Sequence, residues 1–87
     1  MGVGRYAYFY FMGADAERIP AVAPAHSAHW HDLALDGYEG GPFEDRTGGL
    51  ITFRAESQAQ ADIAVATDPF VRDGLLETYW LKEWNPQ

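Results

Sequence analysis

Apolar and polar residues follow two different spacings along this chain, and each change of spacing marks where an element begins or ends. Successive side chains of a strand point to opposite faces, so runs of aromatic and branched residues, or alternation of apolar with polar ones, predict strands. Such stretches cover residues 5–12, 50–55 and 75–84, and a shorter extended piece broken by glycines covers residues 38–43. The chain is therefore expected to form four strands.

The segment between the first two strands fits a helix. Pro24 suits the first helical turn, where its missing N–H costs nothing, and the Asp36-Gly37 pair is typical of a C-terminal turn. We therefore expect a loop over residues 13–20, followed by a helix over residues 24–35.

A second helix is expected between the third and fourth strands. Ser57 and Gln60 have the spacing of a capping box, and the residue before Pro69 disfavours helical geometry, so this helix ends before that proline. The resulting order, βαββαβ, is that of a ferredoxin-like α+β fold, with an antiparallel four-stranded sheet and two helices on one face. No internal repeat interrupts it, and a single domain over residues 1–87 is the simplest interpretation.

The strands carry more apolar bulk than one covered face can bury. This bulk falls on both faces of the expected sheet, at Tyr6, Phe9, Phe53, Tyr79, Trp80 and Trp84. Exposing the second face would leave a large apolar patch, and a domain of 87 residues gains burial when another chain covers it. We expect a homodimer that packs sheet to sheet.

Composition narrows the classes of partner and the compartment. Thirteen acidic residues against six basic ones give a formal charge of −7, which repels phosphate backbones and anionic lipids. The chain has no cysteine, which excludes disulfides and thiolate chemistry, and the apolar run over residues 6–12 is too short to span a bilayer. We expect a soluble cytoplasmic protein that binds neither nucleic acid nor membrane.

Candidate chemistry centres on His26 and Asp68. A histidine can donate or accept a proton near neutral pH, and a carboxylate on its other ring nitrogen fixes the tautomer and stabilises the imidazolium. The helical spacing turns His26 toward the sheet and His31 toward solvent. Each residue also has a simpler interpretation, His26 as a core histidine bonded to a backbone carbonyl and Asp68 as a turn initiator before proline.

A metal or cofactor site is not expected. His26, His29, His31 and Asp32 suggest metal ligands, but His31 diverges from the helix face of the others and the chain has no second histidine pair. The sequence also lacks a nucleophile elbow, a glycine-rich phosphate loop and a dinucleotide fingerprint.

Four features of the chain form a recognisable set. They are the segments Pro24-Ala25-His26-Ser27-Ala28-His29-Trp30 and Asp68-Pro69-Phe70-Val71-Arg72-Asp73-Gly74, the Gly41-Pro42 pair, and the strand-like end over residues 75–84. In these features the chain resembles the YciI-like (YCII-related) family. The resemblance implies a ferredoxin-like dimeric α+β barrel in which His26 and Asp68 would be the catalytic dyad. Most members have no established substrate, although one branch includes a dehydrochlorinase of chlorinated-aromatic breakdown.

The resemblance also indicates a pocket. Its expected wall consists of Tyr8, His29, Gly41, Pro42 and Phe70. A Gly-Pro pair is also an ordinary turn. For the strand tyrosines at positions 8 and 10, we favour a place in the dimer interface over a contact with a ligand.

One departure from the family pattern affects the expected substrate. Many members carry an arginine three or four residues before the helical histidine, where this chain has Val22 and Ala23. The nearest upstream arginine is Arg18, so an anionic substrate would lose a bidentate partner unless Arg18 folds back.

These observations predict a small, cofactor-independent enzyme that moves protons on a small organic molecule, as a lyase, an isomerase or a dehydrohalogenase would. His26 would be the general acid or base, and Asp68 would orient it. The alternative is a non-catalytic dimeric module that binds a metabolite or serves a neighbouring enzyme. A structural dimer without a ligand is a third possibility.

Overall fold

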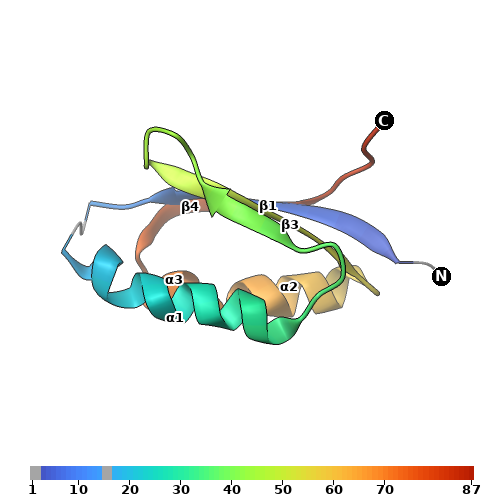
Figure 1. The fold of residues 1–87 in the computed structure, drawn as a ribbon, viewed down its shortest axis with the longest axis horizontal. Coiled ribbons are helices and arrows are strands. Elements are labelled where there is room, and N and C mark those ends of the chain that lie inside the picture. Colours follow the sequence, from blue (N-terminus) through green and yellow to red (C-terminus); the bar gives the residue numbers. More distant parts are fainter. Residues whose placement is uncertain (1–2, 15–16) are drawn as a thin grey trace.

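The protein is built of a sheet covered on one face by helices (Figure 1). The computed structural model describes residues 3–14 and 17–87. In chain order the elements are β1 (Gly4–Met12), α1 (Arg18–Leu33), β2 (Glu39–Pro42), β3 (Gly48–Ala55), α2 (Gln58–Ala66), α3 (Pro69–Arg72) and β4 (Leu76–Glu83). The sheet order is β2-β3-β1-β4 and every neighbouring pair is antiparallel. The expected ferredoxin-like α+β fold is thus confirmed, with strand bounds within two residues of those predicted.

The core lies between the sheet and the helices. Side chains of β1 alternate, and Tyr6, Tyr8 and Tyr10 all point to the helix-covered face, where each is at most 5 % exposed. Ile51 and Phe53 of β3 lie opposite Tyr8 and Tyr6 in the antiparallel register and are buried on the same face. The expectation that Tyr8 and Tyr10 belong to a dimer interface is therefore wrong, because both lie on the face that α1 and α3 cover.

The opposite face of the sheet has no helix over it in Figure 1. Phe9 and Trp80 are cross-strand neighbours there, with ring centroids 6.4 Å apart, and Phe11 meets the same indole at 5.9 Å. Trp80 remains 55 % exposed. This face therefore presents an aromatic surface that the described residues leave uncovered.

Helix α1 begins earlier than its sequence suggested. It starts at Arg18, so the expected loop over residues 13–20 overlaps its first turn, and Pro24 lies inside the helix. An interior proline removes one backbone hydrogen bond. Ile19 and Val22 nevertheless pack against the core from the turns before it, and this apolar contact favours the longer helix. The helix ends at Leu33, where Ala34 takes a left-handed conformation, two residues before the predicted end.

The later helices show one agreement and one correction. The hydroxyl of Ser57 accepts a hydrogen bond from Gln60 N at 3.1 Å, and Gln60 Oε1 accepts one from Glu56 N, so the predicted capping signal begins α2. The segment after Asp68 forms a third helix that was not expected, the short α3, with Pro69 in its first turn. No helix in the described ranges is both long and apolar enough to cross a bilayer.

Candidate functional site

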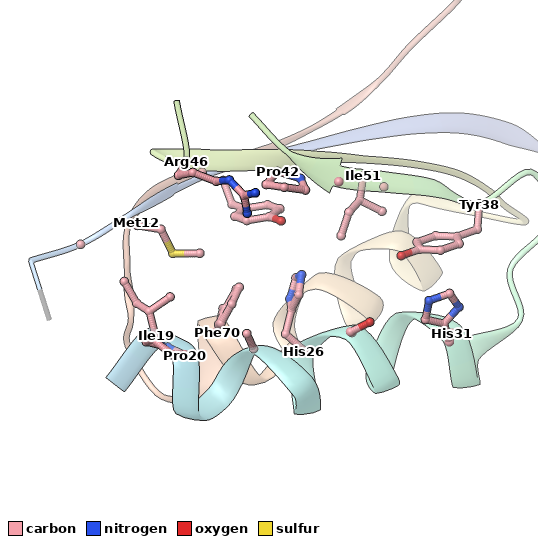
Figure 2. Close-up of a pocket in the computed structure, with 17 residues that line it drawn as sticks. Met12, Ile19, Pro20, His26, His31, Tyr38, Pro42, Arg46, Ile51 and Phe70 are labelled. Atoms are coloured by element: carbon pink, nitrogen blue, oxygen red, sulfur yellow. The ribbon is translucent and has the colours of Figure 1, made fainter. Parts of the chain in front are cut away.

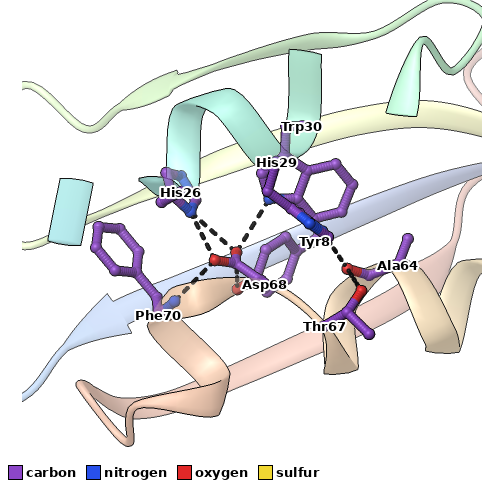
Figure 3. A network of polar contacts seen from close by, with 8 residues as sticks. All are labelled: Tyr8, His26, His29, Trp30, Ala64, Thr67, Asp68 and Phe70. Carbon is purple, nitrogen blue, oxygen red and sulfur yellow. Dashed lines mark hydrogen bonds and ion pairs between the residues drawn. The ribbon is translucent and has the colours of Figure 1, made fainter. Parts of the chain in front are cut away.

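Asp68 is the centre of a buried polar network (Figure 3). It caps α3, where its Oδ1 accepts a hydrogen bond from Phe70 N at 2.9 Å. The residue is completely buried. Pro69 suits the first helical turn that follows, so the local sequence fixes the carboxylate at the start of α3 and points it toward α1 and β1.

Three further donors reach this carboxylate from distant parts of the chain. Tyr8 from β1 and Trp30 from α1 each donate to Oδ2 at 3.0 Å. His26 Nδ1, also on α1, lies 2.8 Å from Oδ1 and 3.0 Å from Oδ2. Burial alone would raise the pKa of Asp68, but hydrogen bonds from His26, Trp30 and Phe70 N and the charge of His26 outweigh it, so the pKa is lowered. Asp68 is therefore ionised at neutral pH.

The carboxylate determines how His26 presents its ring. A carboxylate can only accept, so Nδ1 carries the hydrogen, and in the neutral imidazole Nε2 is left with a free lone pair. The ring stacks on Phe70, with centroids 4.1 Å apart and 15° between the planes. Within the described part of the chain, Nε2 has no hydrogen-bond partner, and it is not a buried atom. The His26 side chain is 12 % exposed. His26 is thus bonded on one nitrogen and open on the other.

That open side faces a cavity of about 830 Å³ between the sheet and α1 (Figure 2). Met12 and Ile19 lie at one end, and His31 and Tyr38 lie at the other. His31, expected to face solvent, is indeed exposed, but its ring also meets Tyr38 at 5.4 Å along the cavity. The volume suits a small organic ligand that carries a ring.

Tyr10 adds a donor that the expected pocket wall lacked. It lines the cavity beside His26, with ring centroids 5.3 Å apart. Burial, with the charge of Asp68 and the nearby Tyr38, raises the pKa of Tyr10 to about 12, so the hydroxyl keeps its proton. Among the described residues this hydroxyl has no hydrogen-bond partner, and its oxygen is not buried. A Cβ on Gly49 would collide with the Tyr10 ring, so this glycine makes room for it.

Of the residues expected in the pocket, only some lie there. Gly41, Pro42 and Phe70 line the cavity together with His26. Tyr8 and His29 do not, which corrects the expectation for both. Tyr8 is completely buried and bonds Asp68, and His29 Nε2 donates to Ala64 O at 2.8 Å. Their roles are therefore to position Asp68 and to join α1 to α2.

The cationic residue in the wall comes from an unexpected element. Arg18 is exposed and does not line the cavity, although Ala23 does. Arg46, in the connection between β2 and β3, lies in the wall instead. Across residues 3–14 and 17–87, no three His, Cys, Asp or Glu side chains gather in a way that could hold a metal ion.

Comparison with known proteins identifies the family of this chain. The family model of the YCII-related domain matches residues 6–85. The chain belongs to the YCII-related domain family. No curated protein matches the sequence of this YCII-related domain.

Solved structures share the fold of this YCII-related domain. One is a 5-chloro-2-hydroxyhydroquinone dehydrochlorinase, TftG, from Burkholderia phenoliruptrix in complex with 2,5-dihydroxybenzoquinone, with a TM-score of 0.81, 23% identity and 93% of each chain covered. An antibiotic biosynthesis monooxygenase has a TM-score of 0.64 at 16% identity, covering 98% of this chain and 100% of the other. Rv0793 from Mycobacterium tuberculosis has a TM-score of 0.66 at 10% identity, covering 99% and 96%. At these identities the likeness establishes the fold.

Proposed function

We propose that this protein is a cofactor-independent enzyme that moves protons on a small, ring-bearing organic molecule, as a lyase, an isomerase or a dehydrohalogenase does. The observation that carries the proposal is the state of His26. Its Nδ1 is held by a buried, ionised carboxylate, while its Nε2 opens into a cavity of about 830 Å³. A module that only binds a metabolite has no need for this arrangement.

In this mechanism the neutral Nε2 of His26 takes a proton from the substrate. Asp68 stabilises the resulting imidazolium through the bond to Nδ1. The Tyr10 hydroxyl donates a hydrogen bond to a substrate oxygen that gains negative charge. In an isomerase the imidazolium returns the proton to another atom, and in a dehydrohalogenase the electron pair of the broken C–H bond forms the double bond as halide departs.

The choice of ring-bearing substrates rests on the cavity and on a structural neighbour. Phe70, Tyr10 and Tyr38 give the cavity aromatic walls. TftG, which shares the fold, is a dehydrochlorinase of a chlorinated hydroquinone and binds 2,5-dihydroxybenzoquinone. Hydroxylated and chlorinated hydroquinones and quinones are therefore the first compounds to test.

The experiment follows proton exchange and elimination directly. The protein is incubated in D₂O with each compound, NMR reports deuterium incorporation and new products, and ion chromatography reports released chloride. We expect His26→Gln to lower kcat by about 10²–10⁴-fold for any compound that turns over, which is the usual contribution of a general acid or base.

His29→Gln is the matched control, because His29 lies one turn along the same helix but outside the cavity wall. This variant should keep kcat. Full turnover by a folded His26→Gln variant would refute the mechanism. Binding of the compounds without any turnover by the wild type would instead support the metabolite-binding module.

We also propose that the protein is a homodimer joined through the uncovered sheet face. The support is the aromatic surface formed by Phe9, Phe11 and Trp80, which no helix among the described residues covers. Burying exposed aromatic area stabilises an association, because such side chains dominate interface energetics. Light scattering at micromolar concentration should give twice the 9.7 kDa chain mass, and Trp80→Glu should give one chain mass. A single-chain mass for the wild type contradicts the proposal.

A further inference from the structure

The cavity differs in charge from the protein that encloses it. The chain has a formal charge of −7, with thirteen acidic residues. None of these acidic residues that the structure describes lines the cavity. Its ionisable wall consists of the tyrosines with His26, His31 and Arg46. A cavity wall without carboxylates and with a permanent cation favours a negatively charged ligand.

Arg46 is held over the cavity by its turn. It lies between β2 and β3, where its N–H donates to Phe43 O at 2.9 Å and its backbone is left-handed, with φ at 64°. In Figure 2 its guanidinium points into the cavity from the sheet side, across from the helix that carries His26.

The guanidinium is not engaged by the carboxylates beside it. Asp45 accepts both the backbone N–H and the hydroxyl of Thr47, at 3.1 and 2.7 Å. Within the described residues, Arg46 has no side-chain hydrogen bond, ion pair or ring contact. Five N–H donors in a planar fork are therefore free to bind a carboxylate or an oxyanion.

We propose that Arg46 binds the anionic oxygen of the substrate, and that the substrate class is small planar anions such as ring carboxylates, phenolates and enolates. This inference rests on the proposed function, because it orients the ligand between Arg46 on the sheet side and Nε2 of His26 on the helix side. The His26–Phe70 ring stack would then lie beside the planar part of the ligand. The arginine clamp is thus supplied by the β2–β3 connection, in place of the positions before the helical histidine.

The test compares two probes of one shape and different charge, benzoate and benzamide. Binding is measured by NMR shift changes of the labelled protein at about pH 9, where a guanidinium stays charged and imidazoles are mostly neutral. We expect benzoate to bind about tenfold more tightly than benzamide, as one charge-assisted bidentate contact allows. Equal affinities, or no benzoate binding at millimolar concentrations, would overturn the inference.

Two substitutions distinguish the effect of the Arg46 guanidinium on binding from any effect of residue 46 on the fold. Arg46→Asn should remove the preference for benzoate without a loss of stability, because asparagine tolerates a left-handed backbone. Arg46→Lys should keep part of it. The control is Arg72→Asn, which also changes the formal charge from −7 to −8 but lies outside the cavity wall. A preference that survives in Arg46→Asn, or that disappears in Arg72→Asn, refutes the assignment.

The outcome is independent of whether His26 catalyses a reaction. His26→Gln keeps Arg46, so this variant should still prefer benzoate. If His26→Gln also keeps full turnover of a substrate, the proposed acid-base mechanism fails while the anion site stands. If the charge preference is absent but His26→Gln abolishes turnover, the anion site fails while the mechanism stands.

Discussion

Replacing Asp68 by asparagine keeps the shape of the side chain but removes a hydrogen-bond acceptor that the network requires. The carboxylate accepts from Tyr8, His26, Trp30 and the backbone of Phe70. The amide of asparagine has one accepting oxygen and one donating nitrogen. If the nitrogen occupies the place of Oδ2, the indole N–H of Trp30 loses its acceptor, and if it occupies the place of Oδ1, the N–H of Phe70 loses its acceptor.

Either orientation therefore leaves one buried N–H unpaired. An unsatisfied buried donor costs about 1–3 kcal/mol, and the remaining bonds lose the strengthening that a charged acceptor gives. Tyr8 and His26 can adapt, the first by rotating its hydroxyl and the second by changing tautomer. We expect Asp68→Asn to lower the free energy of unfolding by about 2–4 kcal/mol.

Urea unfolding followed by tryptophan fluorescence measures this loss, at a fixed protein concentration so that any self-association is constant. The pKa of Asp68 is lowered in the fold, so its ionised form contributes stability that is complete above the unfolded pKa of about 4. That contribution disappears as the pH falls through the lower folded pKa. The difference between wild type and Asp68→Asn should therefore shrink as the pH falls below about pH 4.

Asp45→Asn is the matched control, because the pKa of this carboxyl is also lowered, by its bonds to Thr47, but the group is exposed. Its substitution should change the stability far less than that of Asp68. If the stability difference between wild type and Asp68→Asn stays the same from pH 7 to about pH 3, the carboxylate charge does not stabilise this network. If Asp68→Asn loses no more stability than Asp45→Asn, the argument from unpaired donors is refuted.

Three further substitutions test the surroundings of the site and the start of α2. Gly49→Ala places a methyl group against the Tyr10 ring and 2.7 Å from Gly41 O. It should lower the free energy of unfolding in urea by about 1–3 kcal/mol. A Cβ on Gly41 meets nothing within 4 Å, so the control Gly41→Ala should be nearly neutral. Ser57→Ala removes the acceptor for Gln60 N and should cost about 1 kcal/mol, and an unchanged midpoint would show that the cap is dispensable.

The strands could be predicted because their signal is local. Alternation along 75–84 and 50–55 identifies each strand without knowledge of its partner. The start of α1 could not be predicted, because the packing of Ile19 outweighs the local penalty of Pro24. Helix α3 was missed because four residues are too few to display a helical period.

The site was predictable only in part, and for a similar reason. Only the family resemblance singles out His26 with Asp68, because their contact joins positions 42 residues apart. Strand alternation puts Tyr10 and Tyr8 on one face of β1, but the local pattern does not say which face the helices cover. Arg46 is part of a polar turn in the sequence, and only the pairing of β2 with β3 brings that turn over the cavity.

The position of Asp68 also has a consequence for the order in which the chain folds. Its bond to Phe70 is local and can form as soon as the first turn of α3 does, whereas the donors Trp30, His26 and Tyr8 lie 38, 42 and 60 residues away in sequence. Contacts across such separations form late, because closing long loops costs chain entropy before the contacts compensate for it. Until they form, the carboxylate has neither its burial nor its imidazole. The site therefore appears only when the fold is complete. A partly folded chain does not have a weaker form of this site, because it has no site.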